Sequence, residues 1–396
     1  MELRDELISM HACFICSEYP PAPHGGTGSS YRDLAEGLVA AGHQATVVGI
    51  YQSKHGGGTE EKLNGVRIVR LNHSPNWLRY KLGALADRYR ISRWLARENR
   101  KTRFDVIEAS DYDGWLRFGG PKGVPTVVRI RGSNYFFDTE LQRNGNAFEH
   151  NLERESLARA NVIGSVSRYA AIKTLDVCGL SHRPWTILYN AVDTDLFSPS
   201  DSVQTEPGLI VFVNYINPKK GIEQLIDAMN IVCQSHPEAR LVAIGQDTQK
   251  PENGQAYLEK LKERIRPEFR DRIIFTGRLD RYKGVVEYLR RAHICCYPSH
   301  METFGIAPLE AMSVGKPTIF SKTGPGPEII EDNISGLLCD PRSPEDIAAK
   351  IIFLLEDARL AKMLGANARQ RVETLFCKKD WVQRNLEFYK NCIATW

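Results

Sequence analysis

The feature that most constrains the fold of this chain is a regular alternation of short apolar runs with longer helical segments. Most of the short runs are almost continuously apolar, as in parallel strands that are covered on both faces. Segments of helical length separate most of them, which favours parallel α/β layers with right-handed crossovers. The expected strands are residues 10–16, 46–50, 66–71, 105–109, 126–130, 162–166, 185–188, 209–213, 239–244, 273–275, 294–297, 318–320 and 336–338.

The alternation is interrupted once, by a polar stretch after residue 190 that contains two prolines and has no apolar periodicity. Such a stretch is typical of a linker. We therefore predict two Rossmann-like parallel-sheet domains, 1–195 and 209–377, with a linker at 196–208. Residues 378–396 are helical by pattern, and we expect this helix to pack back toward the N-terminal domain. Ligands of such sheets bind beyond the carboxyl ends of the strands, so two sheets facing a central cleft would hold a ligand there.

The composition and charge exclude several classes of protein. Of the 396 residues, 42% are hydrophobic and 25% are charged, which is ordinary for a globular protein. A net charge of +4 is too small to indicate a nucleic-acid partner. The charged start, Met1 to Glu6, does not resemble a signal peptide, and the nine cysteines are scattered. We therefore expect a reduced, cytoplasmic protein.

Cysteine and histidine give only weak indications of metal or redox chemistry. Cys13 and Cys16 form a C-x-x-C pattern, but they lie within an apolar run and no second pair exists. We interpret them as small buried residues of a strand, with redox or metal chemistry as the alternative. The ten histidines form no H-E-x-x-H motif, so we expect no bound metal.

A glycine-rich turn follows the first expected strand. Gly25 and Gly26 precede a helical segment, where glycines let the backbone approach a ligand and the helix start offers free N–H groups to an anion. The turn is not G-x-G-x-x-G, so it does not indicate a nicotinamide dinucleotide. The alternative is an ordinary strand-to-helix turn.

Two glutamates define the most specific motif. Glu302 lies in the loop after the strand at 294–297, and Glu310 lies one turn into the helix that follows Gly305. Two carboxylates at the end of a sheet suit sugar hydroxyls, because each can accept two hydrogen bonds. The alternative is that they are acids that complement the helix dipole.

At this motif the chain resembles the retaining glycosyltransferases of family four, which have the GT-B fold. The matching pattern is P-S-x-x-E-x-F-G-x-x-x-x-E-A-M at residues 298–312. The N-A-V-D at 190–193, the K-G at 220–221, the G-K-P-T-I at 315–319 and the segment 324–328 also resemble the family. The resemblance covers nearly the whole chain and is strongest over residues 205–375.

The resemblance implies a role for each residue that matches the motif. Glu310 would hold the ribose hydroxyls of a nucleotide, and Lys220 would stabilise the diphosphate leaving group. Glu302 would hold the donor sugar, together with the backbone of Phe304 and Gly305.

Further positions follow from the same resemblance. Gly25 and Gly26 would line the acceptor side near the phosphates. The base would be cradled, mainly through backbone contacts, by Gly277, Arg278 and Leu279. The arginine that often joins the lysine at the diphosphate is absent from the segment that starts at Asn214, and Lys219 could replace its charge.

A second departure concerns Arg131, which ends the strand at 126–130 where the family often has histidine. Arg131 could bond a sugar hydroxyl or a phosphate of the donor. The alternative is an ion pair with a nearby acid such as Asp111, Asp113 or Asp138.

The resemblance implies a retaining, metal-independent glycosyltransferase that moves a sugar from a nucleotide-diphosphate donor to a hydroxyl of a glycan, a lipid-linked or a small-molecule acceptor. No cofactor is expected beside the nucleotide sugar, for which UDP and GDP are both open. A GT-B epimerase or phosphorylase is a second possibility. A non-catalytic sugar-nucleotide binder or membrane-docked scaffold is a third.

A basic block suggests contact with an anionic membrane. Residues 62–131 contain 16 basic and 6 acidic side chains. At helical spacing, Leu82, Leu85 and Tyr89 share a stripe that we expect to pack on the domain's own sheet. The neighbouring face would carry Trp94 and the arginines, and it could face anionic headgroups or only solvent. These arginines are Arg79, Arg90, Arg93 and Arg97.

Overall fold

The computed structural model describes residues 9–23, 25–75, 80–249 and 255–396, which form two compact units. Unit 1 contains the described part of Met1–Leu188 together with Val382–Trp396, and unit 2 is Tyr189–Trp381. Unit 2 therefore begins before the linker expected at 196–208, and the polar segment belongs to unit 2. Arg369 Nη1 donates to the carbonyl oxygens of Thr194 and Phe197 at 3.1 and 2.9 Å.

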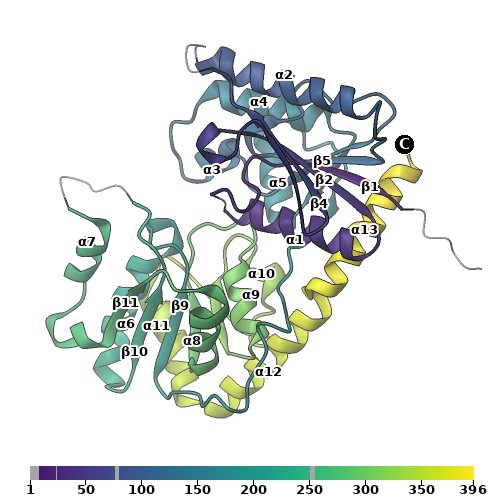
Figure 1. Cartoon of the computed structure of the whole chain (residues 1–396). Helices are drawn as coiled ribbons and strands as arrows, with labels where there is room; N and C mark the ends of the chain where they lie inside the picture. The colour runs from purple at the N-terminus through teal and green to yellow at the C-terminus, as the bar shows by residue number, and fades with distance from the viewer. Residues whose placement is uncertain (1–8, 24, 76–79, 250–254) are drawn as a thin grey trace, which may run out of the picture. The chain divides into compact units, whose positions relative to one another are not determined.

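The sheet of unit 1 has eight strands in the order β3-β4-β2-β1-β5-β6-β7-β8. Figure 1 labels β1, β2, β4 and β5 of this sheet. All neighbouring pairs are parallel except β3 with β4. The chain therefore changes direction along the sheet at β1, which lies between β2 and β5. The strands are β1 (His11–Ile15), β2 (Gln44–Tyr51), β3 (Thr59–Leu63), β4 (Val66–Asn72), β5 (Val106–Ser110), β6 (Thr126–Ile130), β7 (Val162–Ser165) and β8 (Thr186–Ile187).

Helices cover both faces of this sheet because its central strands are apolar on both sides. Cys13 and Ile15 belong to a core cluster that also includes residues of α2, α4 and α5. Phe14 points the other way, toward Tyr31 of α1 and Tyr389 of α13. The helices are α1 (Gly26–Ala40), α2 (Tyr80–Glu98), α3 (Asn134–Glu140), α4 (Ala147–Arg159), α5 (Arg168–Val177) and the part of α13 (Lys378–Ala394) from Val382 onward.

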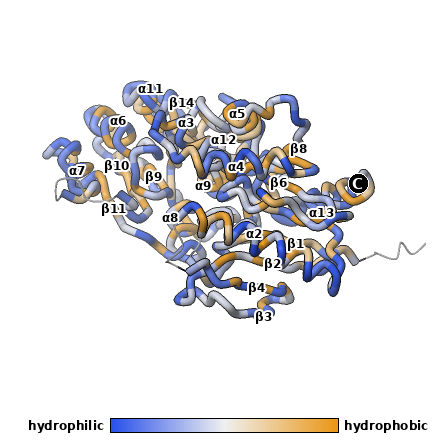
Figure 2. The backbone as a smooth tube through the Cα atoms, turned by 90° about the horizontal axis from the view of Figure 1, so that it is seen from above, coloured by the Kyte–Doolittle hydropathy of each residue, from blue (hydrophilic) through white to orange (hydrophobic). Residues whose placement is uncertain are grey.

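Unit 2 has a parallel sheet of six strands in the order β11-β10-β9-β12-β13-β14. The chain changes direction along this sheet between β9 and β12. The strands are β9 (Leu209–Val213), β10 (Arg240–Ile244), β11 (Ile273–Gly277), β12 (Ile294–Tyr297), β13 (Thr318–Ser321) and β14 (Leu337–Cys339). The helices are α6 (Ile222–Ser235), α7 (Tyr257–Glu263), α8 (Val286–Arg291), α9 (Ile306–Ser313), α10 (Gly326–Ile329), α11 (Pro344–Glu356) and α12 (Ala358–Leu375). In Figure 2, orange and blue alternate along α6, as in a helix with one buried side.

The two-sheet, parallel α/β architecture expected from the sequence is present. Thirteen apolar runs were expected to be strands, and each one overlaps a strand of the structure. The structure also contains one strand that was not expected, β3, which pairs antiparallel with β4. Its sequence is T-E-E-K-L and all five residues are exposed, so it has no apolar run to reveal it. Cys13 and Cys16 are both buried and free.

The expected orientation of α2 is wrong. Leu82 and Tyr89 are 55% and 52% exposed instead of packing on the sheet. Trp94 is buried in the core cluster, although it also lines a groove together with Arg93 and Arg97. Polar contacts account for the difference. Asp87 is buried because its carboxylate accepts hydrogen bonds from the backbone N and the Oγ of Ser74, at 2.9 and 2.6 Å.

Candidate active site

The expected donor residues of unit 2 come together where the sheet changes direction. The loop after β9 leads through Asn214 to Lys220, and the loop after the adjacent strand β12 contains Glu302. Lys220 Nζ lies 2.5 Å from Glu302 Oε1, and both side chains are largely buried. The structure thus joins in one ion pair two residues that are 82 positions apart in the sequence.

Gly221 makes this approach possible. Its φ is +70°, and a Cβ atom there would lie 1.8 Å from the carbonyl oxygen of Pro298 at the end of β12. The carbonyl oxygen of Lys219 accepts hydrogen bonds from the backbone N of His300 and Met301, at 2.9 and 3.3 Å. The K-G turn therefore lies directly against the loop that carries Glu302.

The second glutamate has a partner that the sequence did not indicate. Glu310 is buried in α9, and its carboxylate contacts the guanidinium of Arg281, which follows Asp280 in the turn after β11. Burial raises the pKa of Glu310, and the positive charge of Arg281 opposes this. Arg281 belongs to no motif that we recognised, so only the folded chain reveals it.

The loop between the two glutamates is fixed by packing. Phe304 is buried against Tyr189 and Phe376, with ring centroids at 5.7 and 5.8 Å. Gly305 has a φ of +111° and precedes α9, whose first turn has no side-chain cap among the described residues. The side chain of Phe304 is thus structural, while the N–H groups at the start of α9 remain available to an anion.

The remaining donor candidates lie at the same edge of the sheet. Gly277 ends β11 with a φ of +73°, and Arg278 beside it is exposed. Asn214 follows β9, and its Oδ1 accepts a hydrogen bond from the backbone N of Tyr215. Leu279 is half-buried.

In unit 1, an internal carboxylate occupies the glycine-rich turn. Glu18 accepts hydrogen bonds from the backbone N of Gly25 at 3.0 Å and of Gly28 at 2.7 Å. Glu18 therefore satisfies N–H groups that the sequence suggested were free for an anion. A Cβ atom on Gly26 would meet no atom within 4 Å.

Arg131 lies at the end of β6, but its side chain is buried. Nη1 donates to Ser30 Oγ at 2.9 Å, Nη2 lies 3.9 Å from Glu108 Oε1, and the guanidinium lies over the ring of Tyr31. The backbone N of Arg131 donates to Asp111. These contacts fit the alternative in which Arg131 forms an ion pair, but the acid that faces its guanidinium is Glu108, which was not among the acids that we named.

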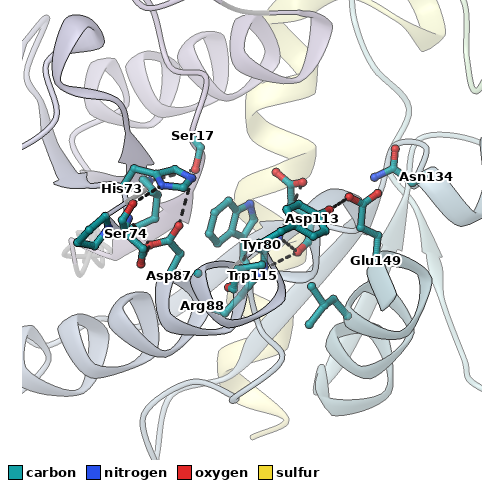
Figure 3. Close-up of a pocket in the computed structure, with 15 residues that line it drawn as sticks. Ser17, His73, Ser74, Tyr80, Asp87, Arg88, Asp113, Trp115, Asn134 and Glu149 are labelled. Atoms are coloured by element: carbon teal, nitrogen blue, oxygen red, sulfur yellow. Dashed lines mark hydrogen bonds and ion pairs between the residues drawn. The ribbon is translucent and has the colours of Figure 1, made fainter. Parts of the chain in front are cut away.

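A pocket of about 630 Å³ opens where the strands β1, β4, β5 and β6 of unit 1 end (Figure 3). It includes the position beside β1 where the chain changes direction along the sheet. His73 and Ser74 follow β4, Asp113 follows β5 and Asn134 follows β6. The helices add further polar and aromatic residues that the sequence did not single out, namely Tyr80, Asp87, Arg88 and Glu149.

Two family models match the chain in succession. The model described as Glycosyltransferase Family 4 matches residues 24–196, and the one described as Glycosyl transferases group 1 matches residues 193–371. An uncharacterised glycosyltransferase of Methanocaldococcus jannaschii is 26% identical in an alignment of 412 positions, which covers 96% of this chain and 98% of that protein.

Solved structures show the same fold. Sucrose-phosphate synthase from Thermosynechococcus elongatus is 22% identical, with a TM-score of 0.79 over 98% of this chain and 100% of that one. HepE from Anabaena in complex with UDP is 18% identical, with a TM-score of 0.75 over 96% of this chain and 100% of that one. The two family models together extend over residues 24–371, and the motifs expected from the sequence lie within them. The chain therefore belongs to the family-four glycosyltransferases, which have the GT-B fold.

Proposed function

We propose that the protein transfers a sugar from a nucleotide-diphosphate donor to an acceptor hydroxyl, with retention of the anomeric configuration. The observation that carries this proposal is the pairing of Lys220 with Glu302, beside the α9 that holds Glu310. The carboxyl edge of one sheet then carries Lys220, the start of α9 without a side-chain cap, and the two carboxylates. Lys220 and the helix start can bind a diphosphate, and the carboxylates can accept hydrogen bonds from sugar hydroxyls.

Each residue has a distinct role in this proposal. Glu310 accepts hydrogen bonds from the ribose hydroxyls, for which its contact with Arg281 must open or rearrange. Glu302 and the backbone of Phe304 and Gly305 hold the transferred sugar. Lys220 lies against the diphosphate, with Asn214 and Lys219 beside it in the chain, and Gly277, Arg278 and Leu279 cradle the base.

The reaction breaks the bond between the anomeric carbon and the diphosphate oxygen. The acceptor oxygen forms a new bond to the same face of that carbon, and its proton moves to the departing phosphate oxygen. Negative charge grows on the diphosphate as the bond breaks, so Lys220 stabilises the transition state more than the ground state. The proposal needs no metal or other cofactor, and unchanged activity in EDTA would support that part.

The nucleotide is proposed from a structural neighbour. HepE was solved in complex with UDP and with UDP-glucose. A uridine nucleotide is therefore the first donor to test, with guanosine nucleotides as the alternative.

The proposal is tested by donor turnover. Purified protein is incubated with UDP-glucose, UDP-N-acetylglucosamine or GDP-mannose, and nucleoside diphosphate release is measured with and without an acceptor. We expect slow hydrolysis of one donor, and its loss in Glu310→Ala. Nucleotide binding without any turnover would instead favour the non-catalytic binder.

We also propose that α2 docks unit 1 on an anionic membrane surface. A groove of about 640 Å³ beside α2 is lined by Leu71, Trp94, Ala96 and four arginines, Arg90, Arg93, Arg97 and Arg100. Leu82 and Tyr89 of the same helix are exposed, and the ring of Tyr89 contacts the exposed ring of Phe118. Arginines next to apolar side chains favour the interface of an anionic bilayer. Arg79 lies outside the described residues.

Within the described part of the chain, none of the helices has both the length and the apolar composition of a membrane-spanning segment.

A further inference from the structure

The pocket of unit 1 has a charge pattern that bears on what it can bind. Among the described residues that line it are three carboxylates, those of Asp87, Asp113 and Glu149, and two basic side chains, Arg88 and His73. Figure 3 shows His73, Ser74 and Asp87 on one side of the pocket and Asp113, Glu149 and Asn134 on the other, with Trp115 between them.

The basic side chains are already engaged. Arg88 donates from Nε and Nη2 to the carbonyl oxygen of Asp113 at 2.9 and 2.6 Å, and from Nη1 to that of Ala84 at 3.1 Å. Its guanidinium also lies 4.6 Å from the ring centroid of Trp115. His73 contacts the carbonyl oxygen of Ser74 through Nδ1 and faces Asp87 through Nε2. Neither side chain can turn to a phosphate without losing these contacts.

The carboxylates differ in how far they are engaged. Asp87 is satisfied by Ser74 and by Arg90, 3.3 Å away. The side chain of Asp113 is 33% exposed and lies 3.9 Å from Arg88 at its nearest. Glu149 contacts the hydroxyl of Tyr80, which leaves acceptor capacity on the carboxylate. Two acidic acceptors therefore face the pocket.

We propose that this pocket binds a hydroxyl-rich sugar without negative charge, an uncharged sugar or an aminosugar, and that it rejects phosphorylated sugars. Hydroxyl and ammonium groups donate to carboxylates. A phosphate would instead lie among like charges, and within the described part of the pocket wall no basic side chain is free to meet it. The inference rests on the proposed function, because it assigns the chemical class of the acceptor.

The test compares three probes on the full chain: glucose, glucosamine and glucose 6-phosphate. Their binding is measured by isothermal titration or ligand-observed NMR, with UDP binding measured separately. We expect glucosamine to bind at least about tenfold more tightly than glucose 6-phosphate at low salt, with glucose between them, and a smaller ratio at high salt. Tighter binding of glucose 6-phosphate, or no binding of any probe, would overturn the inference.

Variants locate the selectivity in the pocket. Asp113 has a φ of +67°, which asparagine also tolerates, so Asp113→Asn keeps the backbone while removing a charge. Asp113→Asn combined with Glu149→Gln should reduce the ratio to about threefold or less. Asp176→Asn combined with Glu387→Gln, at exposed positions on α5 and α13, removes the same charge as a control and should leave the ratio unaltered.

The two proposals fail separately. If UDP, GDP and the nucleotide sugars do not bind, the proposed function is contradicted, while the ranking of the three sugars still decides the pocket's charge selectivity. If a nucleotide binds and glucose 6-phosphate ranks first, only the acceptor inference is contradicted. The ranking in the unaltered chain stands even if a variant does not fold.

Discussion

The hydroxyl of Tyr389 donates a 2.6 Å hydrogen bond to Glu108 Oε2, although the two residues are 281 positions apart. The same oxygen accepts from Arg129 Nη2 at 2.7 Å, and all three side chains are buried. The last helix of the chain therefore completes a buried ion pair in the core of unit 1. Such a pair is costly unless hydrogen bonds satisfy its atoms, which gives Tyr389 a stabilising role.

We expect Tyr389→Phe to lower the free energy of unfolding by about 1–3 kcal/mol, because Glu108 loses a donor in a buried site. The measurement is the unfolding midpoint in urea. Tyr89→Phe, at an exposed position on α2, is the control and should change stability by less than about 0.5 kcal/mol. Equal stability of Tyr389→Phe and the unaltered chain would contradict this role.

Lys220→Ala and Glu310→Ala should impair activity in different ways. Lys220 opposes charge that grows in the transition state, so its removal should lower kcat by about 10²–10³. Glu310 holds the nucleotide in the ground state, so its loss should mainly raise the donor KM. Steady-state kinetics separates the two. If Lys219→Ala lowers kcat while Lys220→Ala does not, Lys219 is the group at the diphosphate.

The pH dependence of nucleotide binding should report on Glu310. The ionised carboxylate accepts the ribose hydroxyls, so affinity is full above its pKa and falls as the pH drops below it. Burial raises this pKa and Arg281 lowers it. Arg281→Ala should therefore move the loss of UDP binding to higher pH, measured by titration calorimetry from about pH 4 to 8. Lys283→Ala in the same turn is the control, and an equal midpoint in both variants would contradict the prediction.

The apolar runs allowed most of the strands, and part of the candidate site, to be predicted from the sequence. A buried parallel strand is apolar throughout, so the strands and the loops at their carboxyl ends could be predicted, and with them the position of Glu302. Lys220 was expected only from the resemblance to the family. The contacts that were missed join distant segments through single side chains. Arg281 with Glu310, Glu18 with the start of α1, and Asp87 with Ser74 have no local pattern. On α2, Asp87 is on the buried side of the helix, whereas Leu82 and Tyr89 are exposed.

Arg131→His distinguishes a donor contact from an ion pair. Arg131 is buried between Ser30, Tyr31 and Glu108, so we expect the variant to lose about 2–4 kcal/mol of stability and to keep its donor preference. The measurements are the unfolding midpoint and relative kcat/KM for two donors. A changed donor preference at unaltered stability would place Arg131 in the donor site.

Vesicle binding tests the proposed docking of α2. Co-sedimentation should require anionic lipid and weaken with salt, because lipid headgroups attract each arginine by about 1 kcal/mol. Replacing Arg90, Arg93 and Arg97 by glutamine should therefore weaken binding by on the order of a hundredfold. The control variant replaces Lys262, Arg266 and Arg270, which are exposed residues of unit 2, by glutamine and so removes the same charge. If the control loses as much binding, the attraction is only that of net charge. If the unaltered chain does not bind anionic vesicles at low salt, α2 is a solvated face, and the acceptor is to be sought among soluble sugars.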